Sequence, residues 1–218
     1  MTQAVRGVLF DLDGTLLDTH DLLLESFRYT TRQVLGRTIP DNLLMAKVGQ
    51  PLNTQMWDFA ADEAEHDELC RVYRDYNKRI HDQRIKSFPG TEQALKELRA
   101  AGLPLGVVTS KRHEPALHGL DTFGLASYFD FVVGSDDFPA HKPDPGPVAH
   151  GCGLMGLPPQ ACVYVGDSPF DMQAGNGAGC VTVAATWGMF PADVLAAENP
   201  AFTCTDIRDF PALIDRLR

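Results

Sequence analysis

Short runs of consecutive apolar residues recur along the chain and alternate with stretches in which apolar residues return every three or four positions. Such uninterrupted runs are typical of parallel strands buried on both faces. They predict strands at about 5–10, 104–109, 131–134, 161–166 and 180–184. The helical spacing predicts intervening helices at 91–101, 114–123, 145–156 and 170–177. This alternation favours an α/β fold, a doubly wound parallel sheet with right-handed crossovers.

The interval between the first strand and the second is long and contains no strand-like run. Apolar residues there have helical spacing, which predicts helices at 18–36, 53–62 and 65–83. We therefore expect a small helical domain at 16–87 inserted into a core domain formed by 1–15 and 88–218. The hinges should lie near Thr15–His20 and Arg84–Pro89.

Composition and charge narrow the class of protein. The 218 residues suffice for one good core and a second small domain, and the formal charge of −10 argues against nucleic acid or an anionic membrane as the main partner. No apolar run approaches about 18 residues, and no basic segment precedes an apolar stretch at the N-terminus. The five cysteines show no CxxC spacing, so we expect reduced thiols and a cytoplasmic protein.

Polar clusters follow the predicted strands, where ligands bind in an open parallel sheet. Any one of them alone has an ordinary explanation, such as a strand-capping turn, a helix N-cap or a solvated lysine. Their order along the chain is carboxylates, hydroxyls, lysine and carboxylates: Asp11, Asp13, Thr109, Ser110, Lys142, Asp167 and Asp171. The ordered set indicates a reactive site.

These clusters resemble the motifs of the haloacid dehalogenase superfamily, and specifically of its phosphatases with a small helical cap. The motifs that carry the resemblance are Asp11-Leu12-Asp13-Gly14-Thr15, Thr109-Ser110, Lys142-Pro143 and Gly166-Asp167 with Asp171. The resemblance covers nearly the whole chain. It implies a Rossmann-like core and a four-helix cap, the insertion at 16–87, that closes over the site.

Phosphoryl transfer needs positioning and charge neutralisation more than elaborate covalent chemistry. Asp11 is the expected nucleophile, which would form an aspartyl-phosphate, and Asp13 is the expected general acid and base. The dehalogenases themselves lack that second acid, so Asp13 favours phosphoryl transfer. The resemblance implies that Asp11, Asp167 and the backbone carbonyl of Asp13 bind Mg²⁺. Asp171 would support the waters of the metal or hold Lys142.

The remaining core residues are expected to bind the phosphoryl group. Thr109, or Ser110 beside it, should donate hydrogen bonds to its oxygens, and Lys142 should offer a point charge to nucleophile and phosphate. Lys111 and Arg112 are expected at the exposed start of a helix.

The cap should determine the leaving group. The segment Lys47-Val48-Gly49-Gln50-Pro51-Leu52 resembles the Gly-x-Pro-Leu turn of phosphoglycolate phosphatases, so Lys47 and Gly49 are expected to bind substrate. This resemblance favours a small phosphorylated metabolite, a phosphoglycolate-like monoester. The segments at 23–27, 73–77 and 81–82 resemble instead a bacterial enzyme that hydrolyses inorganic pyrophosphate, which is the alternative.

Other activities rank lower. β-Phosphoglucomutases share the cap but have Glu-Asp where this chain has Gly166-Asp167. Phosphonoacetaldehyde hydrolase uses a cap lysine, for which Lys47 is in a possible place, but it has no need of Asp13 as an acid. A non-catalytic scaffold would have lost one of the core residues, and all are present. Monomer and homodimer both stay open.

Overall fold

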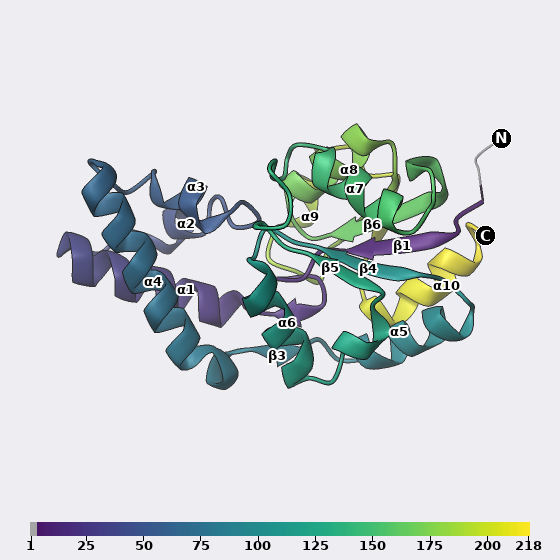
Figure 1. Cartoon of the computed structure of the whole chain (residues 1–218), viewed down its shortest axis with the longest axis horizontal. Helices are drawn as coiled ribbons and strands as arrows, with labels where there is room; N and C mark the ends of the chain where they lie inside the picture. The colour runs from purple at the N-terminus through teal and green to yellow at the C-terminus, as the bar shows by residue number, and fades with distance from the viewer. Residues whose placement is uncertain (1–3) are drawn as a thin grey trace.

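A six-stranded parallel sheet forms the centre of the molecule (Figure 1). The computed structural model describes residues 4–218. The strand order is β5-β4-β1-β6-β7-β8, and every neighbouring pair is parallel. The strands are β1 (Gly7–Phe10), β4 (Leu105–Val108), β5 (Phe131–Val133), β6 (Cys162–Gly166), β7 (Val181–Ala185) and β8 (Phe202–Cys204). This arrangement confirms the predicted doubly wound α/β fold.

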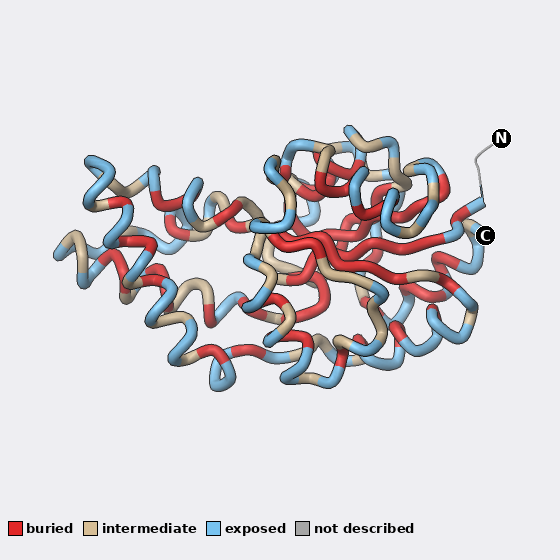
Figure 2. The backbone as a smooth tube through the Cα atoms, in the orientation of Figure 1, coloured by how far each residue is buried: buried red, intermediate tan, exposed pale blue. Residues whose placement is uncertain are grey.

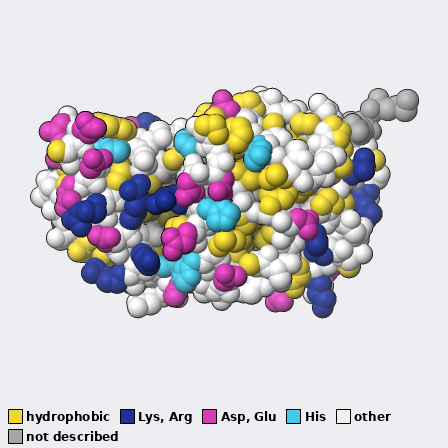
Figure 3. Space-filling model, viewed as in Figure 1, with side chains coloured by type: hydrophobic (Ala, Val, Ile, Leu, Met, Phe, Trp, Pro, Cys, Tyr) yellow, Lys and Arg dark blue, Asp and Glu magenta, His cyan; other side chains and the backbone are white. Residues whose placement is uncertain are grey.

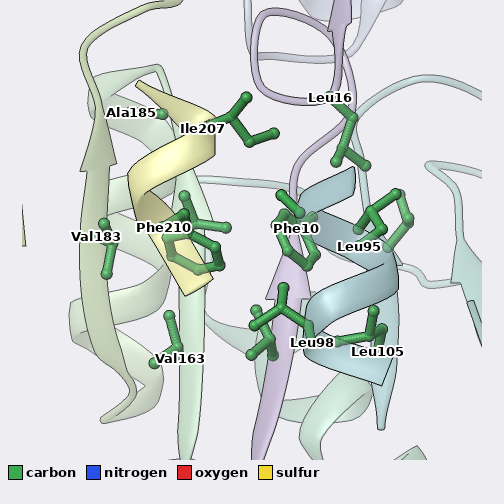
Figure 4. Close-up of a cluster of buried hydrophobic side chains, with 14 of the residues drawn as sticks. Phe10, Leu16, Leu95, Leu98, Leu105, Val163, Val183, Ala185, Ile207 and Phe210 are labelled. Atoms are coloured by element: carbon green, nitrogen blue, oxygen red, sulfur yellow. The ribbon is translucent and has the colours of Figure 1, made fainter. Parts of the chain in front are cut away.

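Helices cover both faces of this sheet because its strands are apolar on both sides. In β1, Val8 and Phe10 belong to one hydrophobic cluster and Leu9 to another, as expected when successive side chains point to opposite faces. The first cluster contains residues of α5 (Thr91–Ala100), α6 (His113–Thr122) and α10 (Phe210–Asp215). In Figure 4, Phe10 lies between Phe210 and Leu95 in this cluster.

The opposite face is covered by α7 and α8, with α9 packed at its edge. The bounds are α7 (Gly146–Leu154), α8 (Pro169–Ala178) and α9 (Ala192–Ala196). Three short 3₁₀ helices complete the core: η1 (Ala126–Tyr128), η2 (Pro159–Ala161) and η3 (Ile207–Asp209). None of the helices within residues 4–218 has the length and apolar composition needed to cross a membrane.

Helices α1–α4, which we call the cap, form a second lobe beside the sheet (Figures 1 and 2). They are α1 (His20–Leu35), α2 (Asp41–Leu44), α3 (Leu52–Met56) and α4 (Glu63–Arg84). The cap has a hydrophobic cluster of its own, centred on Phe27, Met56 and Leu69. Gly36, with a φ of +64°, ends α1, and the Asp62 side chain caps α4 by accepting a hydrogen bond from the amide of Glu65.

The two connections between cap and core run antiparallel to each other. They form a small ribbon of β2 (Leu17–Asp18) and β3 (Lys86–Ser87). The predicted hinge segments therefore contain two short strands that pair with each other, which the sequence pattern did not reveal. The division of the chain at 16 and 87 stays a prediction.

Several predicted elements differ from the observed ones. The helix expected at 53–62 is only five residues long, because the chain turns after Met56 and Asp62 starts a new helix. β8 and α10 were not predicted. β8 has three residues of which two are exposed, so its apolar run is too short to be recognised.

Candidate active site

Three polar residues meet at one edge of the sheet because three adjacent strands end there. Thr109 follows β4, Asp11 follows β1 and Asp167 follows β6, and these strands are neighbours in the order β4-β1-β6. All three side chains are buried. Parallel strands place their carboxyl ends at the same edge, which explains how residues far apart in sequence converge.

Lys142 reaches the same point from the loop before α7. Its ammonium donates hydrogen bonds to Asp11 Oδ1 at 2.8 Å, to Asp171 Oδ1 at 2.5 Å and to the Tyr164 hydroxyl oxygen at 3.0 Å. Burial alone would lower the pKa of Lys142. The nearby charges of Asp11 and Asp171 raise this pKa by more than burial lowers it, so the net change is upward. The lysine is therefore a fixed positive charge in contact with Asp11.

Asp171 is fully occupied by partners within the protein. Besides Lys142, its Oδ1 accepts a hydrogen bond from the Tyr164 hydroxyl at 2.9 Å, and its Oδ2 accepts from the Ser168 amide and hydroxyl at 3.0 and 2.5 Å. Ser168 and Asp171 form a reciprocal capping box at the start of α8. Of the two roles expected for Asp171, this geometry favours holding Lys142.

Asp167 is positioned by the loops that follow β1 and β7. Its Oδ1 accepts a hydrogen bond from Thr15 Oγ1 at 3.2 Å, and its Oδ2 accepts one from the amide of Met189 at 2.8 Å. Gly14 has a φ of +84°, and a Cβ built there would lie 2.1 Å from Asp167 Oδ2. Only glycine permits this approach, which accounts for the Gly in the Asp-Gly-Thr turn.

Three buried carboxylates share this space with one buried ammonium. One oxygen from each of Asp11, Asp167 and Asp171 lies within 4.8 Å of the others. Burial and the neighbouring Asp171 raise the pKa of Asp11 to about 7, and the same two causes raise the pKa of Asp167 well above its usual value. When all three are ionised, Lys142 leaves an excess of two negative charges. A hard divalent cation such as Mg²⁺, which prefers oxygen ligands, fits this donor set.

Asp13 lies outside that buried group and has a different partner. Both of its carboxylate oxygens accept hydrogen bonds from Lys111 Nζ, each at 2.7 Å. The expectation that Lys111 is exposed is wrong, because only 11% of its side chain is accessible. Its long side chain folds back over the site instead of extending from α6, whereas Arg112 is exposed and pairs with Asp136.

A cavity of about 1210 Å³ lies over these residues, between the core and the cap. Asp11, Asp13 and Thr109 line it from the core, and Arg74 and Lys78 of α4 line it from the cap. Basic side chains gather on the cap close to where it meets the core (Figure 3). The cavity therefore has charged side chains of both signs on both walls: the cap adds Asp75 and Asp82 to Arg74 and Lys78, and the core adds Lys111 to its carboxylates.

The turn containing Gly49 brings the cap against the core. Ser110 Oγ donates a hydrogen bond to the Gly49 carbonyl at 2.6 Å, so this hydroxyl is engaged by the cap. Gly49 lines the cavity, but Lys47 is not among the lining residues. The Lys47 ammonium instead pairs with Asp58 at 2.5 Å on the exposed side of the cap. The structure therefore brings Gly49, and not Lys47, to the other predicted residues.

Two further residues of the site were missed by sequence reasoning. Tyr164 lies within β6, where its aromatic ring fits an ordinary buried strand and its hydroxyl gives no local signal. Thr15 follows the Asp-Gly turn and was treated as part of that turn. A polar group inside an otherwise apolar strand is the one pattern that could have singled out Tyr164.

Comparisons with known proteins find similarity over nearly the whole chain. A family model described as haloacid dehalogenase-like hydrolase matches residues 8–185. A protein of Caldanaerobacter subterraneus subsp. tengcongensis named "Putative pyrophosphatase PpaX" is 38% identical over 203 residues, which are 93% of this chain and 91% of that protein. "Pyrophosphatase PpaX" of Bacillus velezensis is 33% identical, over 94% of each chain.

Solved structures give the same fold. A crystal structure titled as a predicted phosphoglycolate phosphatase from Haemophilus somnus superimposes with a TM-score of 0.89 at 27% identity, covering 98% of this chain and 99% of that one. A predicted phosphatase from Clostridium acetobutylicum gives a TM-score of 0.87 at 26% identity, covering 99% and 100%. The similarity in each case includes the cap as well as the sheet.

Proposed function

The chain belongs to the haloacid dehalogenase-like hydrolase family, and from this premise we propose that it is a Mg²⁺-dependent phosphatase whose preferred substrate is inorganic pyrophosphate. The observation that carries the proposal is the presence of two ammonium groups beside the carboxylates: Lys142 contacts Asp11, and Lys111 contacts Asp13. A substrate with phosphate at both ends needs positive charge at the leaving group as well as at the reacting phosphorus. The names of the two relatives given above support the same substrate.

The reaction would proceed in two steps through Asp11. An Asp11 oxygen attacks the phosphorus, the bond to the bridging oxygen breaks, and Asp13 gives its proton to the departing phosphate. Asp13 then takes a proton from water, whose oxygen attacks the aspartyl-phosphate and releases the second phosphate and Asp11. Lys142 holds Asp11 in place and neutralises charge, and Thr109 donates a hydrogen bond to the phosphoryl oxygens.

Asp11 and Asp167, with the backbone carbonyl of Asp13, would hold the Mg²⁺. When bound, the ion would offset repulsion between the anionic nucleophile and the phosphate, which amounts to roughly 4 kcal/mol for two unit charges about 4 Å apart at an effective dielectric near 20. Lys142 remains necessary beside the ion, because three ionised carboxylates carry one more negative charge than a divalent cation can neutralise.

Lys111 is the residue that we assign to the leaving phosphate. In the structure its ammonium contacts both Asp13 oxygens, at the place where the leaving group would depart. A leaving phosphate entering here would give the Lys111 ammonium a second anionic partner beside Asp13.

Arg112 supplies a matched control for this assignment. It has the same charge and is adjacent in sequence, but its side chain is exposed and paired with Asp136. We expect Lys111→Ala to lower kcat/KM for pyrophosphate at least tenfold more than kcat/KM for p-nitrophenyl phosphate, whose leaving group has no phosphate. Arg112→Ala should leave both values within about twofold of the unsubstituted protein. If Lys111→Ala lowers kcat/KM equally for both substrates, Lys111 acts only on Asp13 and does not bind the leaving phosphate.

The direct test compares phosphate release from pyrophosphate and from phosphoglycolate, each as kcat/KM with Mg²⁺. A preference of a hundredfold for pyrophosphate, about 2.7 kcal/mol of transition-state discrimination, supports the proposal. Asp11→Asn should abolish turnover of both. A hundredfold preference for phosphoglycolate would overturn the choice of substrate and leave the two-step chemistry standing.

Phosphoglycolate is the second candidate, and one observation favours it. The turn formed by Gly49, Gln50, Pro51 and Leu52 lines the cavity, as the resemblance to phosphoglycolate phosphatases requires. The carboxylate of phosphoglycolate could pair with Arg74 or Lys78, which line the cavity from the cap. Its leaving group carries one carboxylate rather than a phosphate, so it would gain less from Lys111.

A further inference from the structure

A second group of potential ligands lies where the cap meets the core. His81 and Asp82 are on α4 of the cap, and His118 is on α6 of the core. Asp82 Oδ1 lies 2.7 Å from His81 Nδ1 and 2.9 Å from His118 Nε2. The centroids of the two imidazole rings are 4.8 Å apart. One donor atom from each residue lies within 4.8 Å of the others. In Figure 3, histidine and acidic side chains lie side by side along this boundary.

The donor set differs in kind from that of the active site. Two imidazole nitrogens and one carboxylate oxygen are the three protein ligands of many Zn²⁺ sites, with the fourth position left to water. Mg²⁺, in contrast, prefers oxygen ligands such as the buried carboxylates. We propose that His81, Asp82 and His118 bind a divalent transition metal ion such as Zn²⁺, and that the ion ties the cap to the core.

The surroundings of the three residues suit such an ion. His81 is buried and gives the site a fixed ligand, and burial is the main cause that lowers its pKa and so favours the neutral, metal-binding imidazole. Asp82 and His118 are 63% and 57% exposed, so both can adjust to bond lengths of about 2.0–2.2 Å. Gly119 lets α6 approach: a Cβ there would lie 3.0 Å from Leu17 Cδ1 and 3.8 Å from His81 Nε2.

The three residues also line the cavity above the carboxylates. An ion held jointly by α4 and α6 would oppose separation of the cap from the core, and such lid opening is needed to release product. Zn²⁺ should therefore slow turnover that Mg²⁺ supports. This consequence rests on the proposed phosphatase activity, whereas binding of the ion does not.

The binding test is isothermal titration of Zn²⁺ into the full chain in excess Mg²⁺, which occupies the carboxylate site. The variants are His118→Ala, Asp82→Asn and, as a matched control, His150→Ala, which removes an exposed histidine of α7. We expect one Zn²⁺ per chain in the unsubstituted protein and in His150→Ala, with at least tenfold weaker binding in the other two. No Zn²⁺ binding, or equal binding in His118→Ala, would overturn the site and leave only a hydrogen-bonded His–Asp–His group.

The second measurement is kcat at Zn²⁺ concentrations that fill the site, with Mg²⁺ present throughout. Slowing of the unsubstituted protein and of His150→Ala, but not of His118→Ala, supports the tie between cap and core. Zn²⁺ that binds at these residues without lowering kcat would overturn it. Absence of phosphatase activity in all variants would count against the proposed function alone, since the titration tests the metal site independently.

Discussion

Replacing Gly49 by alanine tests whether contact of the cap with the core is part of the working site. Gly49 has a φ of +102°, which costs an alanine about 1–2 kcal/mol. A Cβ built there would also lie 2.7 Å from Ser168 Oγ and 2.9 Å from Ser168 Cβ. Ser168 cannot easily yield, because its hydroxyl and amide are both held by Asp171.

The clash can be relieved by lifting the cap turn from the core, without unfolding either part. Overpacking of this kind typically costs about 1–3 kcal/mol. We therefore expect Gly49→Ala to lower the free energy of unfolding by only about 1–2 kcal/mol, from the backbone strain. The remaining cost should oppose cap closure and lower kcat/KM by about ten- to a hundredfold, equivalent to about 1.4–2.7 kcal/mol.

Gly36→Ala is the control, because it imposes left-handed strain on the cap without a clash. Gly36 has a φ of +64°, and nothing lies within 4 Å of a Cβ built there. It should lose about 1 kcal/mol of stability and keep its activity. The assays are urea denaturation and phosphate release at saturating Mg²⁺. If kcat/KM is the same in both variants, the approach of Gly49 to Ser168 has no part in catalysis and the reasoning is refuted.

Three further outcomes follow from the structure. Tyr164→Phe should lower the free energy of unfolding by about 1–3 kcal/mol in urea denaturation and reduce kcat, because it removes a buried hydroxyl bonded to Lys142 and Asp171; an unchanged midpoint would contradict this. Lys47→Ala should leave kcat/KM within about twofold, because its ammonium faces Asp58 on the exposed surface, and a tenfold loss would place Lys47 at the substrate. Removing divalent cations with a chelator should abolish phosphate release and Mg²⁺ should restore it; turnover that persists in the chelator would exclude the assigned role of the carboxylates.

Features set by local pattern were predictable from the sequence. Apolar runs identified five of the six strands of the sheet, and the polar residues after them converge because parallel strands end at a common edge. The ordered motifs led to the family, which the comparisons confirm, and to the residues that stand nearest the site. The roles assigned to those residues stay predictions until the variants are measured.

Other features depend on which side chains meet once the chain has folded. Lys111 and Asp13 are 98 positions apart, and neither position signals the other in the sequence. The same holds for Tyr164, whose hydroxyl finds a partner only after α8 and the loop of Lys142 have packed against β6.

The sequence by itself therefore determined the parallel sheet and the family, and it predicted a helical insertion and a set of reactive groups. Periodicity and strand ends are local properties of the chain, because they depend only on residues that are neighbours in the sequence. Only the tertiary structure decided that Lys111 faces the site while Lys47 does not, and that His81 meets His118 across the boundary. Such pairings depend on side-chain directions and on how the cap packs against the core, which neither spacing nor composition specifies.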